Sequence, residues 1–222
     1  MGCVSSSFSN FVFMEKEEIS NSLADLIVAF HHKGWSAATG TNYSFRLSVA
    51  EDTYWVSQSG KDKSIFESND FMKVELSGDA CPGFEHLKPS AENLLHAVIY
   101  QNSTAQVILH SHSVYATLLS QYAVDKSEHF LRIQGYEVQK AIAGVTSHDQ
   151  EVMIPVFENT QNMHSLKSSI EDRWKFCSKA VGFLIGNHGL YTWGKDLATA
   201  KRHLEAYEFL LECLYKRMLL NN

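Results

Sequence analysis

Short strand-like runs and amphipathic helical stretches alternate along the chain, and this alternation restricts the possible folds more than any other feature of the sequence. Apolar residues recur at helical spacing over 15–32, 90–100, 114–122, about 136–142, 163–177 and a long last helix. Ser90 and Asp196 are expected to cap two of these helices. The strand-like runs between them are SFRLS, TYWVSQS, residues 106–110, FLRI, VMIPVF, AVGFLIG and GLYTWG. We therefore expect an α/β fold with helices on both faces of a central sheet, whose early adjacent strands pair antiparallel.

The size and charge of the chain limit what it can be. With 222 residues, of which 45% are hydrophobic, it can bury one sizeable core. A single domain over 1–222 is expected, with about residues 1–12 as a candidate disordered tail. The formal net charge of −6 shows no excess of Lys and Arg, which argues against a nucleic-acid partner. A small anionic substrate stays possible, because a few local donors suffice to bind it.

The cysteines and the first residues bear on where the chain works. The four cysteines are scattered without a Cys-x-x-Cys pair, so we expect neither a disulfide framework nor a cysteine zinc site, and a cytoplasmic location suits them. No apolar run approaches the roughly 18 residues of a membrane span, so no membrane association is expected. The opening MGCVSS fits a short myristoylation pattern, which we interpret as coincidence.

Two histidines end the strand-like run at 106–110. Side chains alternate across a strand, so His110 and His112 point to one face and can reach one metal ion. His-Ser-His is nevertheless short enough to arise by chance, and each histidine could instead be a hydrogen-bonded core residue. A third candidate is His188, which lies between two strand-like runs and is flanked by Gly186 and Gly189. Three histidines suffice for a catalytic zinc that keeps one coordination position open.

Several longer motifs, in their order along the chain, resemble one family. KPSAENLLHAVIY, ILHSHS and GNHGLYTWG resemble the class II aldolase/adducin superfamily, and SGKDKS, IQGYEVQKAI and IPVFENTQN are similar to its methionine-salvage dehydratase branch. The resemblance extends from about residue 20 over nearly the whole chain. It implies a three-layer α/β/α sandwich with a central, largely antiparallel sheet, and a homotetramer with active sites at subunit borders. It also implies a divalent metal, Zn²⁺ first, on His110, His112 and His188.

The resemblance further implies a reaction, the dehydration of 5-methylthioribulose 1-phosphate to 2,3-diketo-5-methylthiopentyl 1-phosphate. A proton leaves C3 and hydroxide leaves C4, so a metal has to stabilise the enediolate and a carboxylate has to move the proton. Glu137 matches the proton donor/acceptor of the dehydratase branch and is our preferred residue. Glu92 matches the acid/base glutamate of the aldolases and epimerases. From the sequence alone, Glu137 could lie on a solvated helix face, and Glu92 could be a first-turn carboxylate that pairs with His96.

The substrate phosphate also needs donors, and the chain has no nucleotide motif of the P-loop or Gly-x-Gly-x-x-Gly type. The superfamily binds phosphate with short polar turns, whose matching positions here are Thr41, Asn42, Ser59, Gly60 and Ser90, with Lys61 or Lys63 adding charge. Without the family, an ordinary turn is the simpler interpretation of such a Gly/Thr/Asn/Ser stretch.

Two departures from the family pattern keep alternatives open. Thr41 stands where many superfamily members have glycine, and Glu92 stands where some dehydratases have a cysteine. A class II aldolase or epimerase acting on another sugar phosphate, with Glu92 as the acid/base, is therefore the second hypothesis. A third is an adducin-type interaction module without a metal, against which the presence of all three histidines and both glutamates argues.

Overall fold

Eight strands form one sheet in the order β3-β2-β1-β4-β8-β7-β6-β5 in the computed structural model, which describes residues 5–221 and their side chains from residue 16 onward. The MGCVSS pattern begins outside the described residues. The strands are β1 (Tyr43–Phe45), β2 (Thr53–Ser57), β3 (Phe71–Glu75), β4 (Val107–Ser111), β5 (Phe130–Ile133), β6 (Val152–Phe157), β7 (Gly182–Ile185) and β8 (Gly189–Gly194). Each neighbouring pair is antiparallel except the parallel pair β6–β7.

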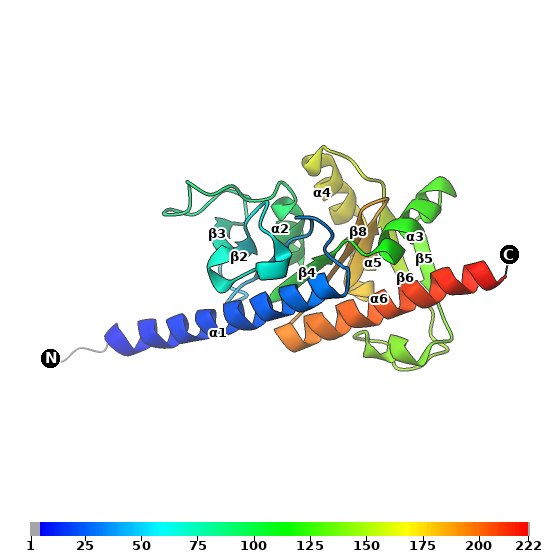
Figure 1. Cartoon of the computed structure of the whole chain (residues 1–222), viewed down its shortest axis with the longest axis horizontal. Helices are drawn as coiled ribbons and strands as arrows, with labels where there is room; N and C mark the ends of the chain where they lie inside the picture. Colours follow the sequence, from blue (N-terminus) through cyan, green and yellow to red (C-terminus); the bar gives the residue numbers. More distant parts are fainter. Residues whose placement is uncertain (1–4, 222) are drawn as a thin grey trace.

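Helices cover both faces of this sheet (Figure 1). They are α1 (Ser5–His32), α2 (Asn93–Asn102), α3 (Val114–Asp125), α4 (Met163–Asp172), α5 (Trp174–Ala180) and α6 (Leu197–Leu220). One buried cluster joins residues of α1, α3 and α6 to the sheet, and the other joins residues of α2, α4 and α5. Neighbouring residues of β4 divide between them, with Ile108 in the second cluster and Leu109 in the first. The predicted three-layer sandwich with a largely antiparallel sheet is confirmed.

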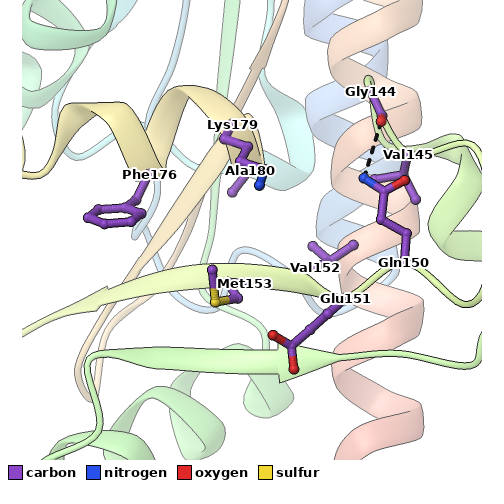
Figure 2. Close-up of a pocket in the computed structure, with 9 residues that line it drawn as sticks. All are labelled: Gly144, Val145, Gln150, Glu151, Val152, Met153, Phe176, Lys179 and Ala180. Atoms are coloured by element: carbon purple, nitrogen blue, oxygen red, sulfur yellow. Dashed lines mark hydrogen bonds between the residues drawn. The ribbon is translucent and has the colours of Figure 1, made fainter.

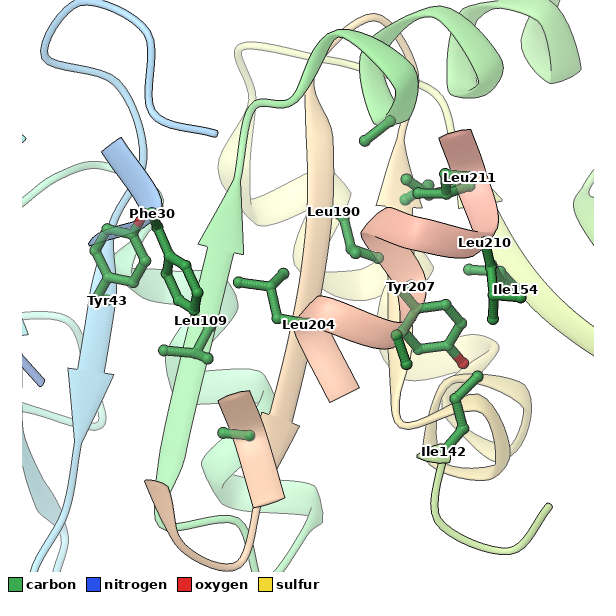
Figure 3. Packing of buried hydrophobic residues seen from close by; sticks show 14 of the residues in the cluster. Phe30, Tyr43, Leu109, Ile142, Ile154, Leu190, Leu204, Tyr207, Leu210 and Leu211 are labelled. Carbon is green, nitrogen blue, oxygen red and sulfur yellow. The ribbon is translucent and has the colours of Figure 1, made fainter. Parts of the chain in front are cut away.

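The core that α1 and α6 share fixes the middle of the sheet (Figure 3). Phe30 of α1, Leu109 of β4 and both Leu204 and Tyr207 of α6 are fully buried in this layer. Burying each such side chain contributes about 1.5–3 kcal/mol. β4, which contains the candidate ligand His110 and directly precedes His112, is therefore held between apolar layers along its length.

Three local predictions need correction. α2 begins at Asn93 with Glu92 at its N-cap, so Ser90 is not the cap. The Ser90 hydroxyl instead accepts a hydrogen bond from the Glu92 N–H at 3.3 Å, in the turn before the helix. The segment expected as a helix at 136–142 is the 3₁₀ helix η3 (Glu137–Ala141). The helix expected at 163–177 is interrupted at Arg173, whose guanidinium donates to the carbonyls of Val156 and His129 at 2.9 and 2.6 Å.

The other short helices, η1 (Lys63–Ile65) and η2 (Ser68–Asp70), connect β2 to β3. None of the helices within residues 5–221 combines the length and apolar character needed to cross a membrane.

Candidate metal centre

Three histidines converge where β4 ends and β8 begins. Antiparallel pairing sets His110 opposite Tyr191 and Ser111 opposite Leu190, so the turn before β8, which contains His188, lies beside the end of β4. The Nε2 atom of His110 lies 2.7 Å from Nε2 of His112 and 3.4 Å from Nε2 of His188. His110 and His112 therefore point to the same side, as the alternation of side chains along a strand predicts. The tertiary fold brings His188 to them as the third histidine.

The hydrogen bonds of the trio suit a cation. His110 donates from Nδ1 to the Leu190 carbonyl at 2.9 Å, which leaves its Nε2 without a hydrogen in the neutral ring. Metal–nitrogen bonds of about 2.0–2.1 Å in a tetrahedron separate the nitrogens by roughly 3.3 Å. The 3.4 Å pair already matches that spacing, and the 2.7 Å pair would open slightly around an ion. The three donors therefore fit a divalent metal such as zinc.

Glu92 completes a group of four side chains whose ligand atoms all lie within 4.8 Å of one another. Its Oε1 is 3.3 Å from Nε2 of His188, and its Oε2 is 3.6 Å from Nε2 of His110. Oε2 also accepts from the Tyr191 hydroxyl at 2.9 Å and from the Asn42 amide at 2.7 Å. The carboxylate can thus serve as a fourth ligand or act on a substrate bound beside the ion.

Burial and charge set the protonation states of the site. Burial, reinforced by the neighbouring His112, holds the pKa of His110 well below its usual range, and burial lowers the pKa of His112 to about 4. Burial alone would raise the pKa of Glu92, but the hydrogen bond from His188 and the charge of His110 outweigh it and keep that pKa far below normal. At neutral pH His110 and His112 are therefore neutral imidazoles beside the Glu92 carboxylate, a combination that suits a divalent cation.

Two glycines make room for the ligands. A Cβ on Gly40 would lie 2.8 Å from Nδ1 of His112. A Cβ on Gly189, directly after His188, would collide with the carbonyl oxygen of Ser111 on the paired strand. The glycine after His188 is therefore needed for the close approach of β8 to the end of β4, whereas the left-handed residue of the turn is Asn187 at φ 52°.

A small pocket of about 100 Å³ adjoins the cluster and contains both Glu92 and His112. Its other lining residues include five that the sequence assigned to phosphate, namely Thr41, Asn42, Ser59, Gly60 and Ser90. Thr41 occupies the left-handed region at φ 75°, a conformation that favours the glycine expected here from the family pattern. The structure thus brings together the predicted phosphate turns and the predicted metal ligands.

The two lysines behave differently. Lys61 is half exposed, forms an ion pair with Asp70 at 2.6 Å and does not line the pocket. Lys63 is only 1% exposed and donates to the carbonyl of Lys61 at 2.9 Å. Burial lowers the pKa of Lys63 to about 8. Its charge also contributes to the lowered pKa of His112, so Lys63 is the lysine whose field reaches the metal site.

Glu137 is not part of this group. It lies on η3 with its side chain 70% exposed, where it pairs with Lys140 and lies 3.8 Å from Nδ1 of His148. The hydrogen bond from Lys140 lowers the pKa of this carboxyl. Within one chain, the predicted acid/base and the predicted metal ligands therefore remain separate.

Another hollow, of about 80 Å³, lies between the segment leading into β6 and helix α5 (Figure 2). Gln150 bridges one side of it by donating to the Gly144 carbonyl at 3.3 Å. Its lining includes Lys179 and Glu151 but no histidine or cysteine. It lacks the ligand set of the histidine site.

Sequence reasoning missed Tyr191. This fully buried tyrosine stacks on the His110 ring, with centroids 3.8 Å apart, and donates to Glu92. The motif GNHGLYTWG contains it, but its role depends on the β4–β8 register, which the sequence does not reveal. Its hydroxyl and its ring act on two different site residues at once.

The fold and the histidine cluster define a class II aldolase-like protein with a candidate metal centre. Residues 21–215 match the family described as Class II Aldolase and Adducin N-terminal domain. The chain belongs to this family.

Relatives of known name are similar over nearly the whole chain. A protein of Picosynechococcus sp. named methylthioribulose-1-phosphate dehydratase is 44% identical over 202 residues, 90% of this chain and 92% of the relative. One of the same name from Pseudomonas fluorescens is 38% identical over 205 residues, 91% of this chain and 95% of the relative. L-fuculose-1-phosphate aldolase from Thermus thermophilus has a similar fold, with a TM-score of 0.67 and 19% identity over 90% of this chain and 95% of that one.

Proposed function

We propose that this chain removes water from 5-methylthioribulose 1-phosphate to give 2,3-diketo-5-methylthiopentyl 1-phosphate in methionine salvage. The observation that carries the proposal is the 44% and 38% identity, over about nine-tenths of the chain, to proteins named for this dehydration. The grouping of Glu92 with three histidines supports it, because the reaction needs a metal beside a carboxylate.

His110, His112 and His188 would hold the divalent cation, which we take to be zinc. Bound there, the cation would act as a Lewis acid that polarises the ketose oxygens and makes the C3 proton more acidic. The neutral histidines would leave the ion its full charge, and Glu92 would lie within reach of the bound ketose. The polar pocket beside them would take the phosphate, through Thr41, Ser59, Gly60 and Ser90.

Glu137 would exchange the C3 proton in the active site of a neighbouring subunit. Its exposure and its separation from the cluster support this assignment, because a carboxylate that acts in its own chain should lie near its own metal. The adjacent surface has exposed apolar side chains, Val138 at 37% and Phe209 at 49%, which suit a subunit contact. We propose a homotetramer with active sites at its subunit borders, and a cytoplasmic location.

One observation favours a second candidate function. Glu92, the residue that matches the acid/base of aldolases and epimerases, is the carboxylate that lies beside the histidines. Aldol cleavage or epimerisation of another sugar phosphate would need only this carboxylate and the metal. The two functions make different predictions for Glu137, since the dehydratase requires it and the alternative does not.

The test is a diketone assay on metal-analysed protein with 5-methylthioribulose 1-phosphate. We expect product from the wild type, loss of product and metal in His110→Ala, and loss of product with metal retained in Glu137→Gln. Glu171→Gln is the matched control, because Glu171 is also a surface glutamate near a lysine of its own helix, with Lys167 at 3.9 Å. A metal-loaded wild type that makes no diketone would exclude the dehydratase.

Subunit complementation tests the placement of Glu137. Co-expression of His110→Ala with Glu137→Gln should restore part of the activity, since a hybrid oligomer contains some sites with both an intact metal centre and an intact Glu137. No recovery in hybrids whose mixed composition is verified by mass would place Glu137 in the active site of its own chain or outside catalysis.

A further inference from the structure

A buried chain of polar side chains runs from Glu92 into the layer between β1 and α2. The Asn42 amide nitrogen lies 2.7 Å from Oε2 of Glu92, and the Asn42 amide oxygen contacts Nε2 of His96. Nδ1 of His96 lies 2.6 Å from the Ser44 hydroxyl, which lies 2.8 Å from the Tyr100 hydroxyl. Asn42, Ser44, His96 and Tyr100 are all at most 3% exposed, so water does not compete for these contacts.

The direction of every hydrogen bond in this chain follows from the orientation of the Asn42 amide. Its nitrogen donates to Oε2 of Glu92, so its carbonyl oxygen faces His96. His96 must then donate from Nε2. Burial lowers the pKa of His96 to about 3, so the ring is neutral and its Nδ1 carries no hydrogen. Nδ1 therefore accepts from Ser44, which in turn accepts from Tyr100.

The same contacts distinguish the two oxygens of Glu92. Oε2 accepts from both Asn42 and the Tyr191 hydroxyl, whereas Oε1 has neither bond and faces Nε2 of His188 at 3.3 Å. Oε2 is thus fixed by two hydrogen bonds although it also lies 3.6 Å from Nε2 of His110, whereas Oε1 is free of both bonds and faces His188. Without the Asn42 contact, only the Tyr191 hydroxyl would hold Oε2, and rotation of the carboxylate about its last bond would be less restricted.

We propose that Asn42 and His96 are positioning residues that fix the carboxylate of Glu92, with Asn42 holding Oε2 and His96 holding the Asn42 amide in the required orientation. The proposal rests on the proposed function for its kinetic part only. It also assigns Asn42 a different role from the phosphate contact expected from the sequence, because His96 and Glu92 already engage both ends of its amide. Glu92, the N-cap of α2, and His96, one turn further along the helix, are linked through Asn42 instead of pairing directly.

His203 provides a matched control. It is also a histidine at 1% exposure with both ring nitrogens hydrogen bonded, but it lies outside the site. Its Nδ1 lies 2.7 Å from the Trp193 carbonyl, and its Nε2 accepts from the Ala143 N–H at 3.1 Å. The two histidines are therefore opposite tautomers, with the hydrogen on Nε2 in His96 and on Nδ1 in His203.

The first experiment is independent of catalysis. ¹⁵N spectroscopy of the histidine rings in the zinc-loaded protein, with His96→Gln and His203→Gln used for assignment, should show His96 with its hydrogen on Nε2 and His203 with its hydrogen on Nδ1. His96 protonated on Nδ1 would reverse the chain of donors and overturn the proposal, whether or not the protein is a dehydratase.

The second experiment measures the dehydration in Asn42→Ala, His96→Leu, the double variant and His203→Leu, each checked for full metal content. We expect kcat to fall about 10–100-fold in each site variant, the range typical of groups that orient a metal site from outside. KM and the inhibition constant of inorganic phosphate should change less than about threefold. The double variant should be no slower than Asn42→Ala, because both changes break one chain.

His96→Gln should recover much of the activity, since its amide can donate to Asn42 and accept from Ser44. The proposal would be contradicted if the fall in kcat of the double variant equalled the product of the falls in the two single variants. A loss of phosphate affinity in Asn42→Ala at unchanged kcat would also contradict it. So would an equal loss of kcat in His203→Leu. If the wild type makes no diketone, the proposed function fails while the tautomer experiment still decides the hydrogen-bond chain.

Discussion

Replacing Glu208 by glutamine should change how the stability of the protein depends on pH. Glu208 lies on α6 and is 2% exposed; its Oε1 accepts from the Ser111 hydroxyl, and its Oε2 has no hydrogen-bond partner among the described residues. Burial, which outweighs hydrogen bonds from Ser111 and Ser113, raises its pKa from 4.5 to about 7. The folded chain therefore keeps a proton between these pH values that the unfolded chain releases.

The sign and size of the effect follow from this difference in proton binding. Because the folded state binds the proton more tightly, the wild type should lose stability as the pH rises from about 4.5 to 7, by roughly 3 kcal/mol. Glutamine does not titrate. The free energy of unfolding of Glu208→Gln, relative to wild type, should therefore rise by roughly 3 kcal/mol across the same range.

Urea unfolding of metal-free protein at pH 4.5 and pH 8, at one protein concentration, measures this difference. Glu212→Gln is the control, because Glu212 lies one turn further along α6, is partly exposed and pairs with Lys216. If the free energies of unfolding of Glu208→Gln and wild type differ by the same amount at both pH values, the predicted raised pKa of Glu208 is refuted. Such a result would mean that Glu208 is hydrated or compensated by a neighbouring charge.

Three further predictions concern the site and its turns. Gly189→Ala should lower the free energy of unfolding by about 1–3 kcal/mol and should also lower the metal content, because the new methyl group meets the carbonyl of Ser111, which lies between two ligands. Gly194→Ala is the control, since its methyl group meets the backbone of α6 at the other end of β8. This variant should be destabilised to a similar degree but should keep the metal. Thr41→Gly should raise the free energy of unfolding by about 1 kcal/mol. It relieves a left-handed residue and removes a buried hydroxyl that has no hydrogen-bond partner in the described part of the chain. A loss above about 1 kcal/mol in urea unfolding would contradict this. A chelator should lower the melting temperature of the metal-loaded wild type but not that of His112→Ala, and an equal shift in both would place the metal elsewhere.

Local patterns predicted much of the architecture. The helical stripe at 15–32 and the strand at 106–110 correspond to parts of α1 and β4, because side-chain periodicity reflects which face of an element is buried. Boundaries were less accurate. The sequence pattern predicts Ser90 as the N-cap of α2, but Ser90 lies in the turn before Glu92. The backbone of Arg173 divides the helix that the pattern predicts at 163–177. Caps and breaks depend on tertiary hydrogen bonds, such as those from Arg173 to β6, that no local pattern records.

The sequence by itself determined the ligand types and the local geometry that pairs His110 with His112, since the alternation of a strand is a property of the backbone. Only the tertiary structure decided that His188, 78 residues along the chain from His110, meets them, because this depends on the register of β4 against β8. It also placed Asn42 and Tyr191 on one oxygen of Glu92 and left Glu137 on the surface. Contacts between distant segments arise from the packing of helices and the pairing of strands, which depends on the whole chain.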